Sequence, residues 1–352
     1  ESSTRMSAPS KDRIILGLMT FGREEKWGAR ITDLDAFKET LDVFKSRGYS
    51  ELDTARAYIG GQQEAFSREA GWREKGFKMA TKVMYPLKPG VHSADKIVEW
   101  VETSLKELGT DCIDILYLHA PDRATPFTET LSALDKLHKQ GKFSQLGLSN
   151  FAAFEVAEVV MTCRHNGWVR PTVYQGVYNA ITRTIEPELL PALRRYGMDL
   201  VVYNPLAGGL LTGAIKSRDV APRSGRFSDE SVTGAHYRAR YFRGSTFEAL
   251  RAVEAAAEEA GLGMVETALR WLVHHSALRV KGGNDGVIVG VSSIAQLRDN
   301  LDHLEKGPLP QEVVDALDRA WDVSRLDTAD YWHLGLEYGY DTREALFGAD
   351  GQ

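Results

Sequence analysis

The sequence predicts an α/β fold in which eight parallel strands, each followed by a helix, close into a barrel. Short apolar segments of the β type alternate with longer segments whose apolar residues recur three and four positions apart, which is helix spacing. The alternation repeats eight times with no proline- or serine-rich linker. An open, doubly wound sheet would also supply the crossovers that parallel strands need, but no G-x-G-x-x-G sequence follows a predicted strand. We therefore expect a (β/α)8 TIM barrel.

Each element is predicted from its own segment of the chain. The predicted strands are Ile14–Leu18, Glu51–Leu52, Phe77–Lys82, Ile113–Leu118, Phe143–Leu148, Val173–Gln175, Leu200–Tyr203 and Val287–Val291. The predicted helices are Asp33–Phe44, Ala94–Leu108, Phe127–His138, Phe154–His165, Pro187–Tyr196, Glu266–His275 and Pro310–Trp321. A glycine closes several of these helices, as at Gly109 and Gly167, which is a common C-terminal cap.

Length and composition restrict the class of protein. The chain has 352 residues, of which 43% are hydrophobic, and we expect a single domain over residues 1–352. A formal net charge of −6 argues against a general nucleic-acid binder. Cys112 and Cys163 are too few for a disulfide framework, and we expect both to be core thiols. No apolar run approaches the roughly 18 residues of a membrane span, so we expect a cytoplasmic protein with a flexible start at residues 1–12.

Two segments depart from the strand–helix rhythm. Residues 207–243, after the seventh strand, form a long loop rich in glycine, serine and arginine. Loops this long are usually functional or disordered, and the arginines of an otherwise acidic chain suggest an anionic ligand. A solvated loop remains the alternative. Residues 323–352 form a C-terminal extension beyond the last predicted helix.

Polar residues with complementary acid–base properties stand at the ends of three successive strands. Asp53 and Tyr58 follow the second strand, Lys82 ends the third, and His119 follows the fourth. A lysine ammonium favours the phenolate form of a nearby tyrosine, so it lowers the pKa of that hydroxyl. A carboxylate can hold the lysine charged, and an imidazole can position a carbonyl oxygen. This group suits delivery of a proton to a carbonyl that is being reduced.

Each of these residues also has an ordinary structural interpretation. Asp53 fits the N-cap of a helix, and Tyr58 fits a partly buried ring. Lys82 fits a solvated strand end, and His119, before Ala-Pro, fits a turn. Their joint occurrence at successive strand ends is much less expected by chance.

At these positions the chain resembles the aldo-keto reductase family. The resemblance rests on residues 52–58 (LDTARAY), 80–82 (ATK) and 114–119 (DILYLH), and on GLSNF at 147–151 and YNPL at 203–206. Residues 119–122 (HAPD), 174–183 and 204–213 are similar to the aflatoxin-aldehyde reductase, or succinic semialdehyde reductase-like, branch. The motifs run in order from about Leu16 to Tyr331, nearly the whole chain.

The resemblance implies a reductase of aldehydes and ketones that uses NADPH and forms NADP+. The resemblance further implies that Tyr58 is the general acid, that Lys82 and Asp53 adjust the pKa of Tyr58, and that His119 orients the substrate carbonyl. The residues implied to bind the cofactor are Ser149, Asn150 and Gln175 (carboxamide), Tyr203 (beneath the ring), Asn204, Pro205, Leu206, Gly208 and Leu210 (pyrophosphate), Arg226 and Arg240, and Ser292, Ser293, Gln296, Arg298 and Asn300 (adenosine end). Ser292 and Ser293 also open a predicted helix, whose N-terminal amides suit a phosphate.

Two departures from the branch affect the substrate. His333 stands where the branch has an arginine that binds a substrate carboxylate, and Phe242 stands where it has tryptophan. Losing the arginine removes a bidentate donor for carboxylate, so we expect an uncharged or aromatic carbonyl compound. The predicted substrate residues are Met19, Trp27, Tyr237, Phe242, Trp332 and His333.

Other functions remain as alternatives. Some relatives of the family are cytoplasmic β-subunits of ion channels, so a cofactor-binding regulatory subunit is the second hypothesis. A metal-dependent barrel hydrolase is third, because no paired metal ligands stand at the strand ends. The adjacent His274 and His275 point in different directions, so we expect one of them to be packed, and we expect no metal site. Branch members are often dimers, which leaves a homodimer open; the remaining expected partner is a small carbonyl substrate.

Overall fold

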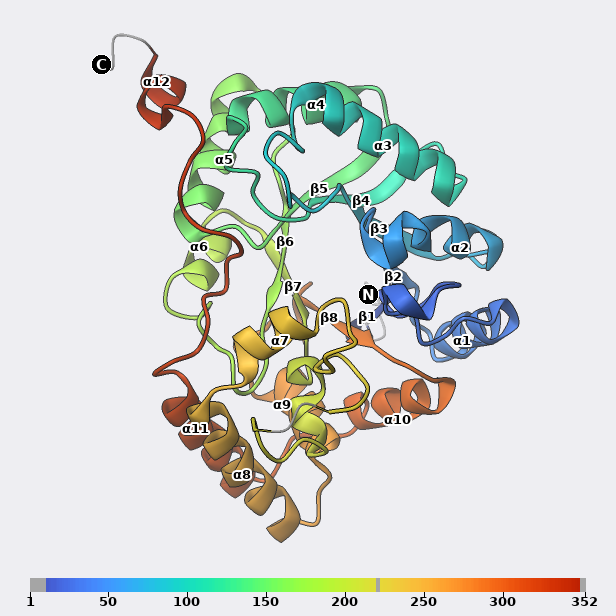
Figure 1. Cartoon of the computed structure of the whole chain (residues 1–352), viewed down its shortest axis with the longest axis vertical. Helices are drawn as coiled ribbons and strands as arrows, with labels where there is room; N and C mark the ends of the chain where they lie inside the picture. The colour runs from blue at the N-terminus through green and yellow to red at the C-terminus, as the bar shows by residue number, and fades with distance from the viewer. Residues whose placement is uncertain (1–10, 220–221, 349–352) are drawn as a thin grey trace, which may run out of the picture.

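The computed structural model describes residues 11–219 and 222–348, and its eight strands form a closed parallel barrel (Figure 1). The strands are β1 (Arg13–Gly17), β2 (Glu51–Asp53), β3 (Lys78–Lys82), β4 (Ile113–Leu118), β5 (Phe143–Ser149), β6 (Val173–Val177), β7 (Asp199–Tyr203) and β8 (Gly286–Gly290). Because β1 pairs with both β2 and β8, the ring has no open edge. The predicted (β/α)8 barrel is confirmed, and every predicted strand is present within two residues of its expected ends.

Helices surround the barrel and cap its mouth. The α-helices are α1 (Leu34–Ser46), α2 (Gln63–Glu69), α3 (Ala94–Leu108), α4 (Phe127–Lys139), α5 (Ala153–Asn166), α6 (Leu189–Arg195), α7 (Gly234–Tyr241), α8 (Gly244–Glu259), α9 (Met264–His274), α10 (Ile294–Leu304), α11 (Gln311–Ser324) and α12 (Thr342–Phe347). The 3-10 helices are η1 (Glu25–Trp27), η2 (Tyr58–Gly61) and η3 (Ala207–Thr212). Gly109 and Gly167 end α3 and α5 in the left-handed conformation, as their sequence positions predict.

The core has two parts, one inside the ring of strands and one between strands and helices. Side chains from six strands, among them Ile15, Ile115, Tyr117 and Ile288, fill the interior of the barrel. Successive residues of a strand point to opposite faces, so alternate residues such as Leu116 pack outward under the helices. The barrel is therefore filled, and its chemistry must lie at the strand ends.

The long segment after β7 contains regular secondary structure. Within residues 207–243 the structure contains η3 and α7, so the prediction of an irregular loop is wrong in part. Tyr237 and Tyr241 of α7 are buried and make ring contacts with Phe227. This aromatic cluster packs the segment against itself, and the Tyr237 hydroxyl connects it to the end of β7 by donating to Asn204 Oδ1 over 3.2 Å.

The C-terminal extension follows a defined path. After α11, which packs against α8, the chain runs past α6 and α5 to α12 (Figure 1). The Tyr331 hydroxyl donates to Glu188 Oε2 over 3.1 Å, and the Tyr338 hydroxyl donates to Glu155 Oε1 over 2.8 Å. These contacts bring residues 331–338 to the region of the strand ends.

Several smaller expectations have clear outcomes. Cys163 is buried in α5, but Cys112 is exposed in the turn before β4, so its prediction as a core thiol is wrong. His274 Nε2 contacts the Lys306 carbonyl and His275 Nε2 accepts from the Leu309 amide, which agrees with packed histidines. The described helices include none long and apolar enough to cross a membrane. Most of the segment expected to be flexible at the start lies outside the described residues.

Candidate active site

The four residues predicted to carry acid–base chemistry meet at one end of the barrel. Asp53 and Lys82 are the last residues of β2 and β3, and His119 directly follows β4. Tyr58 begins η2, five residues after Asp53 in the chain. Because the strands are parallel, their carboxyl ends open on the same face, which is where barrel enzymes place their active sites.

Lys82 is the centre of this group. Its side chain is 1% exposed, so the interpretation as a solvated strand end is wrong. The ammonium donates to Asp53 Oδ1 over 2.6 Å, to the Thr54 carbonyl over 2.8 Å and to the Tyr58 hydroxyl over 3.3 Å. An ammonium has three N–H donors, so all of them are engaged. Since the Tyr58 oxygen accepts from Lys82, its own O–H is left to point at a ligand.

Asp53 is buried and paired rather than capping a helix. Its Oδ2 accepts from Gln175 Nε2 over 2.7 Å, while its Oδ1 accepts from Lys82. Burial lowers the pKa of Lys82, but the Asp53 carboxylate and Tyr58 outweigh it, so the net pKa lies above the usual value. The N-cap interpretation of Asp53 is therefore wrong, and Lys82 stays charged at neutral pH.

Burial has a larger effect on Tyr58 than the lysine does. Burial raises the pKa of the Tyr58 hydroxyl, the Lys82 ammonium lowers it, and the net direction is upward. Lys82 does lower this pKa, as expected, but the effect of burial is larger. Tyr58 is accordingly protonated at neutral pH, which is the form a general acid needs.

His119 lies beside Tyr58 with its ring edge-on. The ring centroids are 5.9 Å apart and the planes are inclined by 77°. Burial, followed by the charge of Lys82, lowers the pKa of His119 well below its usual value. The imidazole is therefore neutral, and its Nδ1 atom is buried with no hydrogen-bond partner in the described part of the chain. A neutral imidazole can orient a carbonyl oxygen without adding a charge.

Backbone strain gathers at this end of the barrel. Among the described residues, the non-glycine residues with positive φ are Ile59, Asn150, Asn204, Ala207 and Leu334. Ile59, the residue directly after Tyr58, is β-branched and buried, and it has a φ of 50°. Left-handed backbone at such residues is costly and persists where the surroundings impose it, often at functional sites.

The residues predicted to hold the nicotinamide are brought together at the ends of β5, β6 and β7. Asn150 Nδ2 donates to Ser149 Oγ over 3.0 Å, and Asn150 Oδ1 accepts from the Tyr203 hydroxyl over 2.7 Å. Gln175, on β6, reaches Asp53 as described above. The amide groups thus lie next to the acid–base group, with the Tyr203 ring alongside.

The predicted pyrophosphate segment begins directly after β7. Asn204, with φ of 58°, accepts at Oδ1 from the Tyr237 hydroxyl over 3.2 Å. Gly208 has φ of 71°, and a Cβ there would lie 2.7 Å from the Tyr237 ring. Pro205 and Leu210 are buried, whereas Leu206 is half-buried. Gly208 is therefore required both by its backbone and by the close approach of Tyr237.

The predicted adenosine end lies at the start of α10. Ser293 is the N-cap and accepts from the Gln296 amide over 3.2 Å, which confirms the predicted helix start. Gln296 Oε1 in turn accepts from both the amide and the hydroxyl of Ser292. Arg298 is exposed, and Asn300 is buried in the same helix. The first turn of α10 thus presents amides and one exposed arginine.

Arg226 is the feature that best fits an anionic cofactor. Its guanidinium donates to the Tyr237 hydroxyl over 2.5 Å, and none of the ion pairs within residues 11–219 and 222–348 includes it. A Cβ on Gly290, the last residue of β8, would lie 3.5 Å from Arg226 Nη2. A half-buried cation without a carboxylate therefore lies near the helix start that Ser293 caps, and such a pairing suits a phosphate group.

The other predicted arginine and the substrate residues have mixed surroundings. Arg240 donates to the Asp330 carbonyl over 3.0 Å, at the C-terminal extension. Trp27 is 45% exposed and packs beside Gly60 of η2, next to Tyr58. Phe242 stacks on Phe227 with centroids 5.1 Å apart, inside the aromatic cluster. The remaining predicted substrate residues are Met19 and Trp332, both half-buried, and the buried Tyr237.

His333, in the C-terminal extension, contacts two of the predicted nicotinamide residues, Tyr203 and Asn150. Its ring contacts the Tyr203 hydroxyl through Nε2 over 3.2 Å and the Tyr85 hydroxyl through Nδ1 over 3.1 Å. Burial, then the charge of Arg240, lowers the pKa of His333 to about 3. Tyr85, which was not predicted, also meets the His119 ring edge-on at 5.2 Å. No spacing in the sequence points to Tyr85, because it follows β3 in an irregular segment.

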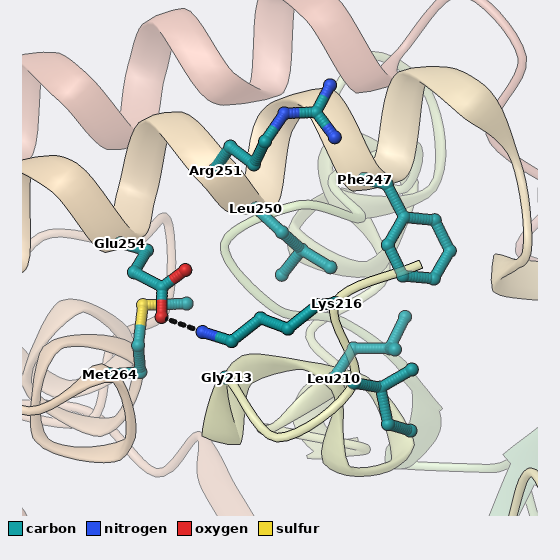
Figure 2. A pocket seen from close by; sticks show the side chains of 9 residues that line it. Leu210, Gly213, Lys216, Phe247, Leu250, Arg251, Glu254 and Met264 are labelled. Carbon is teal, nitrogen blue, oxygen red and sulfur yellow. Dashed lines mark hydrogen bonds and ion pairs between the residues drawn. The ribbon is translucent and has the colours of Figure 1, made fainter. Parts of the chain in front are cut away.

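A separate cavity lies away from the acid–base group. Figure 2 shows it between α8, α9 and the chain around η3, with Leu210 and Phe247 on its walls. An ion pair between Lys216 and Glu254 crosses it, so these two charges neutralise each other. We therefore attribute the chemistry to the strand ends and not to this cavity.

Known proteins place the chain in one enzyme family. A model of the aldo/keto reductase family matches residues 13–322. Aflatoxin B1 aldehyde reductase member 2 of Mus musculus is 43% identical over 335 residues, which cover 92% of this chain and 89% of that protein. The human protein of the same name is also 43% identical, over 343 residues covering 93% and 92%. Human aldo-keto reductase family 7 member A3 is 41% identical over 339 residues, covering 94% and 99%. With its closed barrel and its clustered strand-end residues, the chain belongs to the aldo/keto reductase family, oxidoreductases that act on carbonyl compounds and generally use NAD(P)H.

Proposed function

We propose that the protein reduces an aldehyde or ketone to an alcohol with NADPH, using Tyr58 as the general acid. One observation carries this proposal: Lys82 donates to the Tyr58 hydroxyl over 3.3 Å, which leaves the Tyr58 proton directed elsewhere. The relatives named as aldehyde reductases support the same class of substrate. When bound, the reduced nicotinamide supplies a hydride to the carbonyl carbon.

The cofactor would be held by groups from several strand ends. Ser149, Asn150 and Gln175 would bind the carboxamide, with Tyr203 beneath the ring. The segment from Asn204 to Leu210 would follow the pyrophosphate, and Ser292, Ser293, Gln296, Arg298 and Asn300 would contact the adenosine end. Arg226 would bind a phosphate, because it is a cation without a carboxylate partner among the described residues. Arg240 would contribute a further positive charge at the mouth.

Tyr58 would give its proton to the carbonyl oxygen as the alcohol forms. The phenolate that remains is stabilised by the Lys82 ammonium, which already donates to this oxygen. Asp53 keeps Lys82 charged and fixes its direction through a 2.6 Å hydrogen bond. Lys82 therefore acts on Tyr58 as a fixed charge.

His119 would orient the substrate. A carbonyl within hydrogen-bond reach of both Tyr58 and His119, roughly 2.6–3.2 Å from each, would have its oxygen toward the proton donor. The neutral state of His119 suits this role, because a second mobile proton beside Tyr58 would compete with it.

The surroundings favour an uncharged or aromatic substrate. Tyr85, His333 and Tyr203 lie in contact around the site, and His333 is neutral. A neutral imidazole at position 333 offers a flat ring in place of a bidentate cation. We infer that aromatic aldehydes are reduced better than aldehydes carrying a carboxylate.

A cofactor-binding regulatory subunit is the alternative function, and the test separates the two. NADPH absorbance is followed with 4-nitrobenzaldehyde, succinic semialdehyde, a dicarbonyl and an aromatic ketone, for the wild type and Tyr58→Phe. We expect the variant to lose on the order of 10²–10⁴-fold in turnover, the usual contribution of a general acid, with NADPH binding nearly unchanged. Normal turnover by Tyr58→Phe would refute the acid assignment. Tight NADPH binding with no turnover of any compound would favour the regulatory subunit.

A further inference from the structure

One arginine fastens the C-terminal extension to the barrel. Arg123, in the segment after β4, donates through Nη1 to the carbonyls of His333 and Gly335 over 2.9 and 2.8 Å. Its own carbonyl accepts from the Gly339 amide over 2.8 Å. Arg123 is 5% exposed, so the arginine side of these bonds is buried. A single residue therefore holds the extension at three places.

The other side of the arginine is held by a buried carboxylate. Arg123 Nε and Nη2 donate to the two oxygens of Glu155 over 2.7 and 2.9 Å, a bidentate pair. Glu155 lies in the first turn of α5 and also accepts from the Ala152 amide and from the Tyr338 hydroxyl, each over 2.8 Å. The guanidinium thus has a fixed direction, and the carboxylate adds a further contact with the extension.

This anchoring determines where the His333 ring lies. The His333 amide donates to the Asn150 carbonyl over 3.1 Å, and its ring fits between Tyr85 and Tyr203. The next residue, Leu334, has φ of 65°, a left-handed conformation that a non-glycine residue adopts only when its surroundings impose it. The Arg123 bonds lie on either side of Leu334, at the carbonyls of His333 and Gly335.

The hydrogen bonds around His333 have one consistent direction. Asn150 Nδ2 donates to the His119 carbonyl over 2.9 Å, which leaves Asn150 Oδ1 to accept from the Tyr203 hydroxyl. The Tyr203 proton is then used, so His333 Nε2 must donate to the Tyr203 oxygen. A neutral imidazole has one N–H, so His333 Nδ1 accepts from Tyr85. A chain of directed bonds thus links the extension to the residues beside the acid–base group.

We propose that Arg123 is a positioning residue for the substrate pocket, which it builds by holding residues 331–339 so that His333 stands between Tyr85 and Tyr203. The C-terminal segment is then a preformed wall of the pocket. The selection of uncharged aromatic aldehydes by this pocket depends on Arg123, although the side-chain hydrogen bonds of Arg123 to described residues go to Glu155, His333 and Gly335 and not to the acid–base group. The kinetic part of this inference rests on the proposed reductase function, whereas the anchoring of the segment does not.

The variants Arg123→Met and Arg123→Lys test the proposal together. Methionine keeps the length of the side chain but removes every donor, whereas lysine retains a charge against Glu155. A lysine cannot span both the carboxylate and the two carbonyls, because it lacks the planar fork of arginine. Arg123→Lys should therefore fold with little loss while still releasing His333.

Two readouts separate positioning from stability. We expect KM for 4-nitrobenzaldehyde to rise by roughly ten- to a hundredfold in both variants, as for a misplaced substrate wall, with a smaller change in kcat. KM for succinic semialdehyde should change less. The ratio of the two KM values should therefore move toward 1, which means a weaker preference for the aromatic aldehyde. Hydrogen exchange of the His333 and Gly339 amides, which are bonded to Asn150 and Arg123, should accelerate by roughly tenfold or more.

Arg194→Met is the matched control. Arg194, which is half-buried, also makes a bidentate pair with a buried carboxylate, that of Asp285 just before β8 at the opposite end of the barrel. This variant should lower the stability without changing the ratio of the two KM values. An unchanged ratio in both Arg123 variants, or amides that stay protected, would overturn the proposal. If the wild type reduces no aldehyde, the reductase function fails, while the exchange of His333 and Gly339 still decides the anchoring.

Discussion

Lys82 and Arg226 are cations in the same barrel mouth, but their surroundings differ. Lys82 donates to Asp53, to the Thr54 carbonyl and to Tyr58, so its donors are all engaged by the protein. Arg226 donates to the Tyr237 hydroxyl, and it takes part in none of the ion pairs of the described chain. The protein engages every N–H donor of Lys82, whereas Arg226 has donors that no described residue engages.

The difference indicates what each charge is for. A buried cation that is already neutralised can act only on the groups it touches, so Lys82 acts on Tyr58. A cation without a counter-ion has free donors for an incoming anion, so Arg226 suits a phosphate. Removing the Lys82 charge should therefore lower the stability of the protein. Removing the Arg226 charge should instead weaken cofactor binding and leave the stability nearly unchanged.

The largest effect is expected for Lys82→Met. The variant leaves the Asp53 carboxylate buried without its cation, and breaking such a pair typically costs about 3–5 kcal/mol in the free energy of unfolding. Turnover should also fall by on the order of 10²-fold or more, because the Tyr58 phenolate loses its stabilising charge. Urea unfolding and NADPH oxidation measure the two losses.

The double variant Asp53→Asn with Lys82→Met provides the control. It removes both charges, so much of the stability should return while turnover stays low. Full stability in Lys82→Met alone would show that the pair is not what holds this end of the barrel together.

Arg226→Met should lose binding rather than stability. Its charge-assisted bond to a phosphate is expected to contribute about 1.5–3 kcal/mol, so NADPH affinity should fall by roughly ten- to a hundredfold. Urea unfolding without cofactor should change little, since no carboxylate is left unpaired. Fluorescence titration with NADPH and NADH measures the effect, and Arg298→Met, at an exposed position, should lose no more than about fivefold. We expect a larger loss for NADPH than for NADH, because only NADPH carries a 2′-phosphate. Equal losses for both cofactors would contradict a role of Arg226 at that phosphate.

The smallest effect concerns pH and His333. Burial and then Arg240 and His236, both on α7, lower the pKa of His333 to about 3, whereas an unfolded histidine titrates near 6.5. The unfolded chain therefore binds the proton first, so this contribution to stability is complete above pH 6.5 and declines as the pH falls toward 3.

The variant His333→Gln isolates this contribution. Its urea midpoint should decline less steeply than that of the wild type between pH 6.5 and 5. His165→Gln, on the exposed face of α5, serves as the control and should follow the wild type. Parallel profiles for His333→Gln and the wild type would show that His333 does not titrate abnormally.

The sequence predicts the parts of the site that are local. Asp53, Lys82 and His119 stand at strand ends, and apolar periodicity locates those ends within two residues. The start of α10 follows from the capping chemistry of Ser293. In each case a short segment contains both the element and the residue that depends on it.

Contacts between distant segments could not be predicted in this way. Tyr85 is 248 positions from His333, and Arg123 is 210 positions from the His333 carbonyl that it binds. Neither position has a periodic pattern, because both lie in irregular segments whose path depends on the finished barrel. Phe242 illustrates the same limit, since only the structure reveals that its ring stacks on Phe227.

The pairing of β1 with β8 also has a consequence for how the protein is made. Arg13 lies opposite Gly286, so a chain emerging from the ribosome exposes unpaired edges on β1 and β7 until almost the whole barrel has been synthesised. Contacts this far apart in sequence make folding slow and expose the unfinished chain to aggregation. The segment with His333 emerges later still, so the proposed substrate wall is added only after the ring of strands can close.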